Sequence, residues 1–517
     1  MASVITDMAQ WAAAVSFEEL PPGVVERTRL QHLHLGELVH KGRDLYPALR
    51  KLGPSRGSAP LVGGGFTSAH AAARLHGTIA ADADRLDHLL GGQTGVGAVC
   101  AAWAYSKGKR IDELLLATAV ANEVAGRVGA SMLLGPHYGA GAGWVHAVSA
   151  AVSAGSLLGL DGDKMAHCIA LALSSAGPIP RATLASSGRG IAVGLAVSHG
   201  LEAAQMAQRG VTAPLGLLDS PGGLLELSSW LPLRHAFTGL GEAWLTQTLS
   251  FPKWPGPPAW HSSLDGVAEV LARHLKAADK RLRPDQVRQI VVRVPAPAIA
   301  LDRWMARHGL RESAGLGHSI RHAIGALVVD HELGSKQLAN KDWAERTERY
   351  GSVASHVQIE HDLGLTMDLM NHMVDAAAPL IGGVTEGEWR GLLGRLEMQS
   401  AGWPDFRWGN LLTVARHRPD QWFKRIRYAS GDLGAGHLDQ WQFKMGSGVV
   451  IRTTRGGSWP EDRVIAEGGP GSPWEPLIES VIAGFSAGDP DRLKSGQDAF
   501  EAVVTADSQS WMESLLA

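Results

Sequence analysis

An unusual concentration of acidic groups stands at residues 82–99, which read DADRLDHLLGGQTGVGAV. Asp82, Asp84, Asp87 and His88 crowd together just ahead of a run of glycines. Neighbouring carboxylates repel one another and a glycine run gives up backbone entropy, so a purely structural segment is rarely built in this way. The pattern fits either a solvated loop between helices or the rim of an active site.

Three other patterns that could hold a ligand lack the context their chemistry needs. GRGIAVG (188–194) and GAGAGW (139–144) resemble fragments of phosphate-binding loops, but no predicted strand precedes them. HDLGLTMDLMNHMVD (361–375) offers His and Asp without the spacing of a catalytic zinc site, and we predict a helix surface there. The sequence therefore implies neither a metal nor a nucleotide cofactor.

The composition is that of an ordinary globular protein. The chain has 517 residues, 45% hydrophobic and 19% charged, enough for two or three domains. A formal net charge of −3 gives no electrostatic case for nucleic acid or for a membrane surface. The start of the chain lacks a signal-peptide pattern, and Cys100 and Cys168 read as buried thiols in helices. We therefore expect a cytoplasmic protein that acts on a small molecule.

The first half of the chain has the composition and apolar spacing of a buried helical bundle. Small apolar residues dominate residues 66–215, and apolar positions recur at helical spacing, with glycines near the expected helix ends. The start of the chain reads as a short amphipathic helix, and the last segment, from 474, returns to helix and is expected to pack back on the bundle. The expected helices of the bundle cover residues 111–128, 145–160, 163–176 and 189–210.

The texture changes after residue 250, where FPKWPGPP cannot be helical throughout and marks a domain boundary. Expected helices at 263–276 and 318–333 flank the strand VRQIVVRVPA, and further strands are expected at 395–400, 441–446 and 447–457. We predict an all-α domain from residues 1–250 plus 474–517. A smaller α+β domain takes residues 251–473, with a helical insertion at about 335–440. The cleft between the two domains is the expected ligand site.

Several segments, in order, resemble those of the MmgE/PrpD family, which includes 2-methylcitrate dehydratase, cis-aconitate decarboxylase and iminodisuccinate epimerase. The resemblance implies a mainly α fold, with a large helical domain and a smaller α+β lid domain. It also implies a homodimer and no cofactor. The segments that carry it are HGTIAADADRLDHLLGGQTGVGAV, ANEVAGRVG, WVHAVSAAVSAGSLLGL, SHGLEAAQMAQRGVTAP, KWPGPPAWHSSLDGV and HSIRHAIGALVVDHEL.

The first family positions carry over one by one, with informative departures. Asp84 falls on the family's active-site aspartate, and His88 falls on the threonine that ends the same motif. Thr94 stands where the family has a histidine that acts as an acid/base or carboxylate contact. Arg189 replaces a lysine that binds a substrate carboxylate, which keeps the charge and adds a bidentate fork. The resemblance therefore implies an acid at Asp84, with His88, Thr94 and Arg189 as substrate contacts.

The remaining positions are less faithful to the family. The family's second lysine falls on Pro252, with Lys253 adjacent as a replacement, and its tyrosine becomes His322. His137 is the nearest candidate for another family histidine, and His261 lies in the segment of the second lysine. We expect His322 or His137 to be the catalytic base or acid, and Lys253 and His261 to contact substrate. Each of these residues could instead have a purely structural role, as a core histidine, a loop residue, a surface lysine or a helix cap.

Three functions follow from these positions. The first is a cofactor-independent lyase that removes a proton next to a carboxylate or similar acidifying group of a small organic substrate and expels water or carbon dioxide. The second is an isomerase or cyclase of a specialised pathway that uses the same proton transfer on a less polar substrate, because several polar family positions have become apolar. The third is a catalytically silent binding or scaffold relative.

Overall fold

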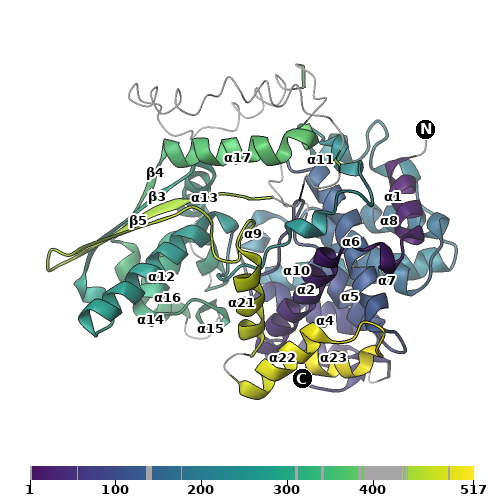
Figure 1. The fold of residues 1–517 in the computed structure, drawn as a ribbon, viewed down its shortest axis with the longest axis horizontal. Coiled ribbons are helices and arrows are strands. Elements are labelled where there is room, and N and C mark those ends of the chain that lie inside the picture. Colours follow the sequence, from purple (N-terminus) through teal and green to yellow (C-terminus); the bar gives the residue numbers. More distant parts are fainter. Residues whose placement is uncertain are drawn as a thin grey trace.

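The computed structural model has a helical part and a part built around a small sheet (Figure 1). Each part has its own large hydrophobic core. The structure describes all residues except 1–2, 55, 135–141, 176, 309–312, 339–342, 382–386, 389–432, 435–437, 439–440, 487–488 and 517. The chain is mainly α with a smaller α+β part, as the sequence predicts. The division into two domains with these boundaries stays a prediction.

Buried Ala, Gly and Val residues form the contacts of the helical bundle. α7 lies at its centre and packs against α5, α6 and α10. Small side chains allow the helix axes to approach closely, which is the reason for the Ala-rich texture. The helices of this part are α1 (Val4–Ala14), α2 (Pro22–Lys41), α3 (Pro47–Leu52), α4 (Ala69–Asp82), α5 (Gly95–Ala104), α6 (Ile111–Ser131), α7 (Ala142–Leu157), α8 (Gly162–Ser175), α9 (Arg181–Leu184), α10 (Gly188–Gln208) and α11 (Leu224–Ser228).

Short elements connect these helices. A two-stranded antiparallel ribbon joins β1 (Ala59–Pro60) to β2 (Phe66–Thr67). Single turns of 3-10 helix lie at η1 (Phe17–Glu19), η2 (Leu215–Leu217), η3 (Arg234–Phe237) and η4 (Leu245–Thr248).

The C-terminal helices pack back on the bundle, as predicted. They are α21 (Trp474–Ser486), α22 (Pro490–Glu501) and α23 (Ser508–Leu516), and all three contact α2 (Figure 1). Phe485 and Trp511 are buried in the larger core, so the end of the chain completes the helical part.

The α+β part is built on a sheet of four strands in the order β4-β3-β5-β6. β3 pairs parallel with β4 and antiparallel with β5, and β5 pairs antiparallel with β6. The strands are β3 (Val287–Val294), β4 (Val357–His361), β5 (Ser447–Thr453) and β6 (Ser458–Arg463). The helical elements around them are α12 (Pro258–Ala278), η5 (Pro284–Gln286), α13 (Ala296–His308), η6 (Ser313–His318), α14 (Ile320–Asp330), α15 (Ser335–Leu338), α16 (Trp343–Ala354) and α17 (Leu363–Ile381).

The strand predictions are partly wrong. The predicted strands at 287–296 and 447–457 are confirmed as β3 and β5, but residues 441–446 form no strand. The predicted strand at 395–400 lies outside the described residues. The sequence also missed β4 and β6: β4 lies inside the segment expected to be a helical insertion, and β6 is an edge strand that contains a proline. Proline is tolerated at an edge but weakens the sequence signal for a strand.

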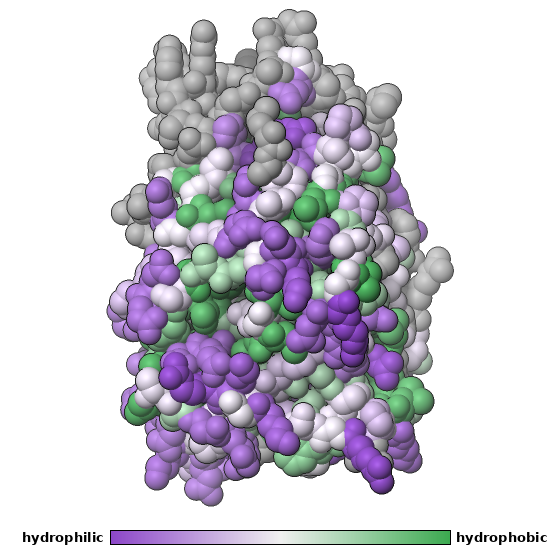
Figure 2. All heavy atoms as spheres, turned by 90° about the vertical axis from the view of Figure 1, so that its right-hand side faces the viewer, coloured by the Kyte–Doolittle hydropathy of each residue, from purple (hydrophilic) through white to green (hydrophobic). Residues whose placement is uncertain are grey.

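The surface is mixed in character. On the face seen in Figure 2, hydrophobic residues emerge in scattered groups between hydrophilic ones. In the part of the chain that the structure describes, we find no helix with both the length and the apolar character to cross a membrane.

Candidate active site

Asp84 lies just after the end of α4, in a backbone conformation that most residues avoid. Its φ angle is +55°, in the left-handed region, which costs a non-glycine residue on the order of 1 kcal/mol. The Asp84 amide donates to the carbonyl of Ala81 (3.1 Å), and its own carbonyl accepts from the Gly256 amide (2.8 Å). Two backbone hydrogen bonds therefore hold this turn, one within the chain at the end of α4 and one from the segment just before α12.

The Asp84 carboxyl group meets a cation and an imidazole. Arg189 Nη1 lies 3.0 Å from Asp84 Oδ2, and His318 Nδ1 lies 3.4 Å from the same oxygen. Arg189 belongs to α10 of the helical part, whereas His318 ends η6 of the α+β part. The cluster therefore forms where the two parts of the fold meet. All three side chains are largely buried: the exposed fraction is 12% for Asp84, 10% for His318 and 5% for Arg189.

Burial dominates the acidity of Asp84. It raises the pKa of this carboxyl group to about 7, although Arg189 lowers the pKa and the nearby Asp82 raises it further. A carboxyl group with a pKa near neutrality can both give and take a proton under ordinary conditions, which is what a general acid or base must do.

Arg189 is held by backbone carbonyls as well as by Asp84. Its guanidinium donates to the carbonyls of Ala81 (2.9 Å), Asp82 (3.1 Å) and Leu184 (2.6 Å). Most of its five N–H groups are therefore engaged within the protein. Arg189 is better placed to position Asp84 and to supply local positive charge than to form a fork with a substrate carboxylate.

Two glycines let the α+β part approach Asp84. A Cβ atom on Gly317 would lie 2.9 Å from Asp84 Oδ2. Gly256 has a φ angle of +100°, and a Cβ atom there would lie 2.1 Å from the Gly317 carbonyl oxygen. The two loops therefore need small residues to bring His318 to Asp84.

We expect Gly317→Ala to disturb the cluster while leaving the fold intact. The added methyl group would push against Asp84 Oδ2, so the contact of this oxygen with His318 should lengthen. A crystal structure of the variant would show the displacement. The free energy of unfolding, measured by thermal unfolding, should fall by no more than about 1–3 kcal/mol, as for other overpacked sites. Gly334→Ala, where a Cβ atom meets open space, is the matched control. An unmoved carboxyl group would contradict this geometry.

His88 is neutral and held in place by its surroundings. Its Nε2 atom lies 3.0 Å from Gln93 Nε2, and its backbone pairs with Ser250 through two hydrogen bonds of 3.0 and 2.8 Å. Burial lowers the pKa of His88 to about 4, against a smaller opposing effect of the backbone of Leu86. A half-buried, uncharged imidazole of this kind is suited to hydrogen bonding with a ligand rather than to binding an anion by charge.

His261 reaches the same turn from the α+β side. The sequence placed it just ahead of a helix that starts at 263, but α12 begins at Pro258, so His261 lies inside the first turn. Its Nε2 atom lies 3.0 Å from the carbonyl oxygen of Gly256, the residue whose amide binds Asp84. Burial is the largest of the effects that lower the pKa of His261, to about 3, so the ring is neutral and braces the Gly256 turn.

Thr94 points into the helical core. It is fully buried, and its hydroxyl donates to Asn122 Oδ1 (2.6 Å). Asn122 also bonds to Gln31, which donates to Asp87 Oδ2 (2.8 Å). Burial raises the pKa of Asp87 to about 6. These four polar side chains stabilise the start of α5, and this engagement leaves the Thr94 hydroxyl little capacity for a substrate.

The other predicted positions are less central. His322 Nδ1 lies 2.9 Å from Ser319 Oγ, and burial lowers the pKa of His322. Lys253 forms an exposed ion pair with Glu467 at 2.7 Å. His137 lies outside the described residues, whereas His146 is fully buried in α7 with its pKa lowered to about 4 by burial.

His318 is the cluster residue that the sequence did not reveal. It stands four positions before His322 in HSIRH, but nothing local marks it as the partner of a carboxyl group more than two hundred residues earlier. The available signal is the preceding glycine pair in GLGHS, which indicates a tight turn that can approach another segment.

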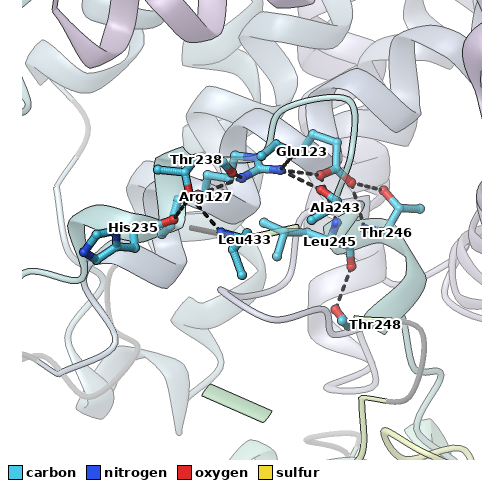
Figure 3. A network of polar contacts seen from close by, with 11 residues as sticks. Glu123, Arg127, His235, Thr238, Ala243, Leu245, Thr246, Thr248 and Leu433 are labelled. Atoms are coloured by element: carbon cyan, nitrogen blue, oxygen red, sulfur yellow. Dashed lines mark hydrogen bonds and ion pairs between the residues drawn. The ribbon is translucent and has the colours of Figure 1, made fainter. Parts of the chain in front are cut away.

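A buried ion pair on α6 holds the chain that supports this site. Figure 3 shows Glu123 accepting hydrogen bonds from the amides of Leu245 (2.9 Å) and Thr246 (2.8 Å) and from the Thr246 hydroxyl (2.8 Å). Arg127 lies 3.6 Å from Glu123. Its guanidinium donates to four backbone carbonyls, those of Ala236, Thr238, Gly239 and Ala243.

The same segment then binds the acidic loop directly. Thr248 Oγ1 accepts a hydrogen bond from the Leu90 amide (2.8 Å), and Ser250 pairs with His88. Helix α6 therefore positions the 84–94 segment through residues 236–250, and not by direct contact alone.

Buried histidines predict acid sensitivity. Burial lowers the pKa of each from 6.5 to about 3 or 4, so the unfolded chain binds these protons more readily. Their stabilisation is present above about pH 6.5 and is lost as pH falls towards 3, at about 1.4 kcal/mol per histidine and pH unit. The residues are His32, His34, His76, His88, His146 and His261.

Denaturant unfolding at about pH 7.5 and pH 5 measures this effect, and the free energy of unfolding should be several kcal/mol lower at the acid pH. Asp84 and Asp87 oppose the trend, since their raised pKa values stabilise the fold as pH falls, but two acids do not offset six histidines. A His76→Gln variant should show a shallower pH dependence. Equal stability at both pH values would contradict the assignment of neutral buried imidazoles.

The fold and the site together define a class: a mainly helical protein with a small α+β part and a buried Asp–Arg–His cluster at their junction. Comparison with known proteins gives the family. Residues 6–230 match the model of the MmgE/PrpD N-terminal domain. This part of the chain is therefore an MmgE/PrpD N-terminal domain, and the family predicted from the sequence is confirmed there.

Two curated relatives match part of this chain. The chain is 29% identical over 153 residues to cis-aconitate decarboxylase of Homo sapiens, a match that covers 29% of this chain and 31% of the relative. It is also 29% identical over 154 residues to cis-aconitate decarboxylase of Mus musculus, with the same shares. The match thus spans about a third of the length of either relative.

Proposed function

We propose that this protein is a cofactor-independent lyase of the MmgE/PrpD type, which removes a proton next to a carboxylate of a small organic acid and expels water or carbon dioxide. The observation that carries the proposal is the buried Asp84 carboxyl group with a pKa of about 7, in contact with His318 and Arg189. The relationship of residues 6–230 to a family that includes a decarboxylase supports the same reaction class.

In the proposed reaction, Asp84 and His318 act as one acid–base pair. Asp84 contacts Nδ1 of His318, and this contact orients the ring whose imidazole is the proposed base. When His318 takes the proton, the adjacent carboxylate stabilises the imidazolium. For loss of water, the C–O bond breaks and the imidazolium gives this proton to the leaving hydroxide. For loss of carbon dioxide, the electron pair of the broken C–C bond stays on the substrate, and the protonated Asp84–His318 pair supplies the additional proton that the substrate takes up.

Charge on the substrate is met from two sides. Arg189 supplies a fixed positive charge next to Asp84. Lys253 is the proposed direct contact for a substrate carboxylate, because its ion pair with Glu467 is exposed and an exposed pair is weak enough to exchange partners. His88 and His261, both neutral, are proposed as hydrogen-bonding contacts or supports at the rim, and the homodimer implied by the family is part of this proposal.

A second candidate is an isomerase or cyclase that uses the same proton transfer without a leaving group. The burial of Thr94 against Asn122 favours it, because the position at which the family has a histidine then offers no group to a polar substrate. A site with fewer polar contacts fits a larger and less polar ligand.

Proton NMR in heavy water tests both candidates at once. The protein is incubated with a panel of small di- and tricarboxylic acids that includes cis-aconitate and 2-methylcitrate, and with unsaturated cyclic acids. Loss of water or carbon dioxide establishes a lyase. Rearrangement without loss of a group, with deuterium incorporated next to a carboxylate, establishes the isomerase or cyclase. Thermal stabilisation by an acid without any exchange or product would instead establish a binding protein and overturn the proposal.

A further inference from the structure

Asp82 ends α4, two residues before Asp84, and is linked to the same arginine. Its side chain is half-buried. The Tyr46 hydroxyl donates to Asp82 Oδ1 (3.1 Å), and the backbone carbonyl of Asp82 accepts from Arg189 Nη2 (3.1 Å). The other terminal nitrogen of this guanidinium, Nη1, lies 3.0 Å from Asp84 Oδ2. Arg189 therefore connects the two acidic residues, and Tyr46 fixes the side chain of the first one.

A close crossing of two helices holds this arrangement in place. Gly190 follows Arg189 in α10, which packs against α4. A Cβ atom on Gly190 would lie 2.6 Å from the carbonyl oxygen of Thr78 on α4 and 3.3 Å from the Tyr46 hydroxyl oxygen. A residue without a Cβ atom is therefore needed for α10 to approach α4 and Tyr46 this closely. The GRGIAVG stretch, whose sequence resembles a phosphate-binding loop, is thus a helix contact that places Arg189 beside the acids.

The charges around Asp84 oppose one another. Arg189 favours the carboxylate form of Asp84, whereas Asp82, a second acid nearby, disfavours it. Burial and the negative charge of Asp82 raise the pKa of Tyr46, so the Tyr46 hydroxyl keeps its proton and remains a hydrogen-bond donor. His318 is a further titratable group that faces Asp84, from the end of η6. The proton on Asp84 therefore depends on a balance between Arg189 and Asp82 as well as on burial.

We propose that Asp82, anchored by Tyr46, is a positioning residue for the reaction at Asp84. Its negative charge opposes that of Arg189 and keeps the Asp84 carboxyl group able to hold a proton. The inference rests on the proposed function, since Asp82 has this role only if Asp84 exchanges a proton. The three crowded acids then have separate roles: Asp82 sets the charge, Asp84 exchanges the proton, and Asp87 belongs to the buried network at the start of α5.

An NMR titration of the Asp84 carboxyl carbon in the labelled full chain tests this role without a substrate. Asp82→Asn keeps an acceptor for the Tyr46 hydroxyl but removes the charge, so the titration midpoint of Asp84 should fall by roughly 0.5 to 1 pH unit. Asp82→Glu keeps the charge, so the midpoint should stay within about 0.3 pH unit of the wild type. Asp44→Asn removes an exposed acid two residues before Tyr46, and this matched control should leave the midpoint unchanged.

The pH profile of deuterium uptake should follow the NMR result, with the limb that Asp84 produces displaced to lower pH by the same amount in Asp82→Asn. A midpoint that Asp82→Asn does not lower, or that Asp82→Glu lowers as far, would overturn this inference and leave the proposed function standing. A wild-type midpoint near 3.8 would overturn both, because Asp84 would then hold no proton at neutral pH. Circular dichroism and thermal unfolding establish that each variant is folded before it is titrated.

Discussion

Asp84→Asn is expected to lower the rate of proton transfer by a factor of roughly 10² to 10⁴, the usual contribution of a general acid or base. Asparagine keeps the size of the side chain and tolerates the left-handed backbone at this position. It removes the group that exchanges a proton and orients His318. Turnover, or deuterium uptake into an acid that the wild type exchanges, provides the measurement.

The fold should survive this change, which separates chemistry from stability. A carboxyl group whose pKa is raised stabilises the folded state below its ordinary pKa of 3.8, and that contribution is lost as pH rises through about 7. At pH 8 the variant should therefore be at least as stable as the wild type. Asp87→Asn is the matched control, because it changes a buried acid of the same segment that does not contact the cluster. Activity of Asp84→Asn within tenfold of the wild type would remove Asp84 from the proposed mechanism.

Arg127→Met should give the largest loss of stability, on the order of 3–5 kcal/mol, because removing one partner of a buried pair leaves the other charge uncompensated. Glu123 would keep its bonds to Leu245 and Thr246 but lose its cation. The four carbonyls bound by Arg127 would also lose their donor. Denaturant unfolding measures the loss.

The loss of Arg127 should also affect the backbone near His88. Since residues 236–250 connect α6 to the loop of His88, hydrogen exchange should become faster at Leu90 and Ser250. Arg283→Met, the same substitution at the exposed ion pair with Asp285, should cost no more than about 1 kcal/mol. Equal losses in the two variants would show that the network in Figure 3 does not carry the stability assigned to it.

The sequence could predict the helices because their signal is local. The periodic apolar residues of 111–128 correspond to α6, and the small residues of 189–210 correspond to α10. β4 and β6 escaped prediction because each is short and is defined by its pairing with a neighbour, β4 by the parallel ladder to β3 and β6 by its place at the edge. Strand signals of this kind depend on tertiary context.

The residues of the candidate site were likewise predictable from the sequence only in part. Asp84 was within reach of the sequence, because the crowded acids ahead of the glycines are visible in one short stretch and the family resemblance selects Asp84 among them. His318 was not, because only the fold brings η6 to the end of α4. The inward direction of Thr94 was equally hidden, since it depends on Asn122 on another helix. Arg189 was found, but its three backbone acceptors make it a support for Asp84 first.

Whether Asp84 exchanges a proton at neutral pH decides whether this cluster can do the proposed chemistry. The direct measurement is an NMR titration of aspartate side-chain carboxyl carbons in isotope-labelled protein, with the spectrum of Asp84→Asn used for assignment. We predict one carboxyl signal that titrates near pH 7 in the wild type and is missing from the variant. An Asp84 signal that titrates near the ordinary value of 3.8 would contradict the proposal, because the carboxylate would then be a permanent partner of Arg189 with no proton to move.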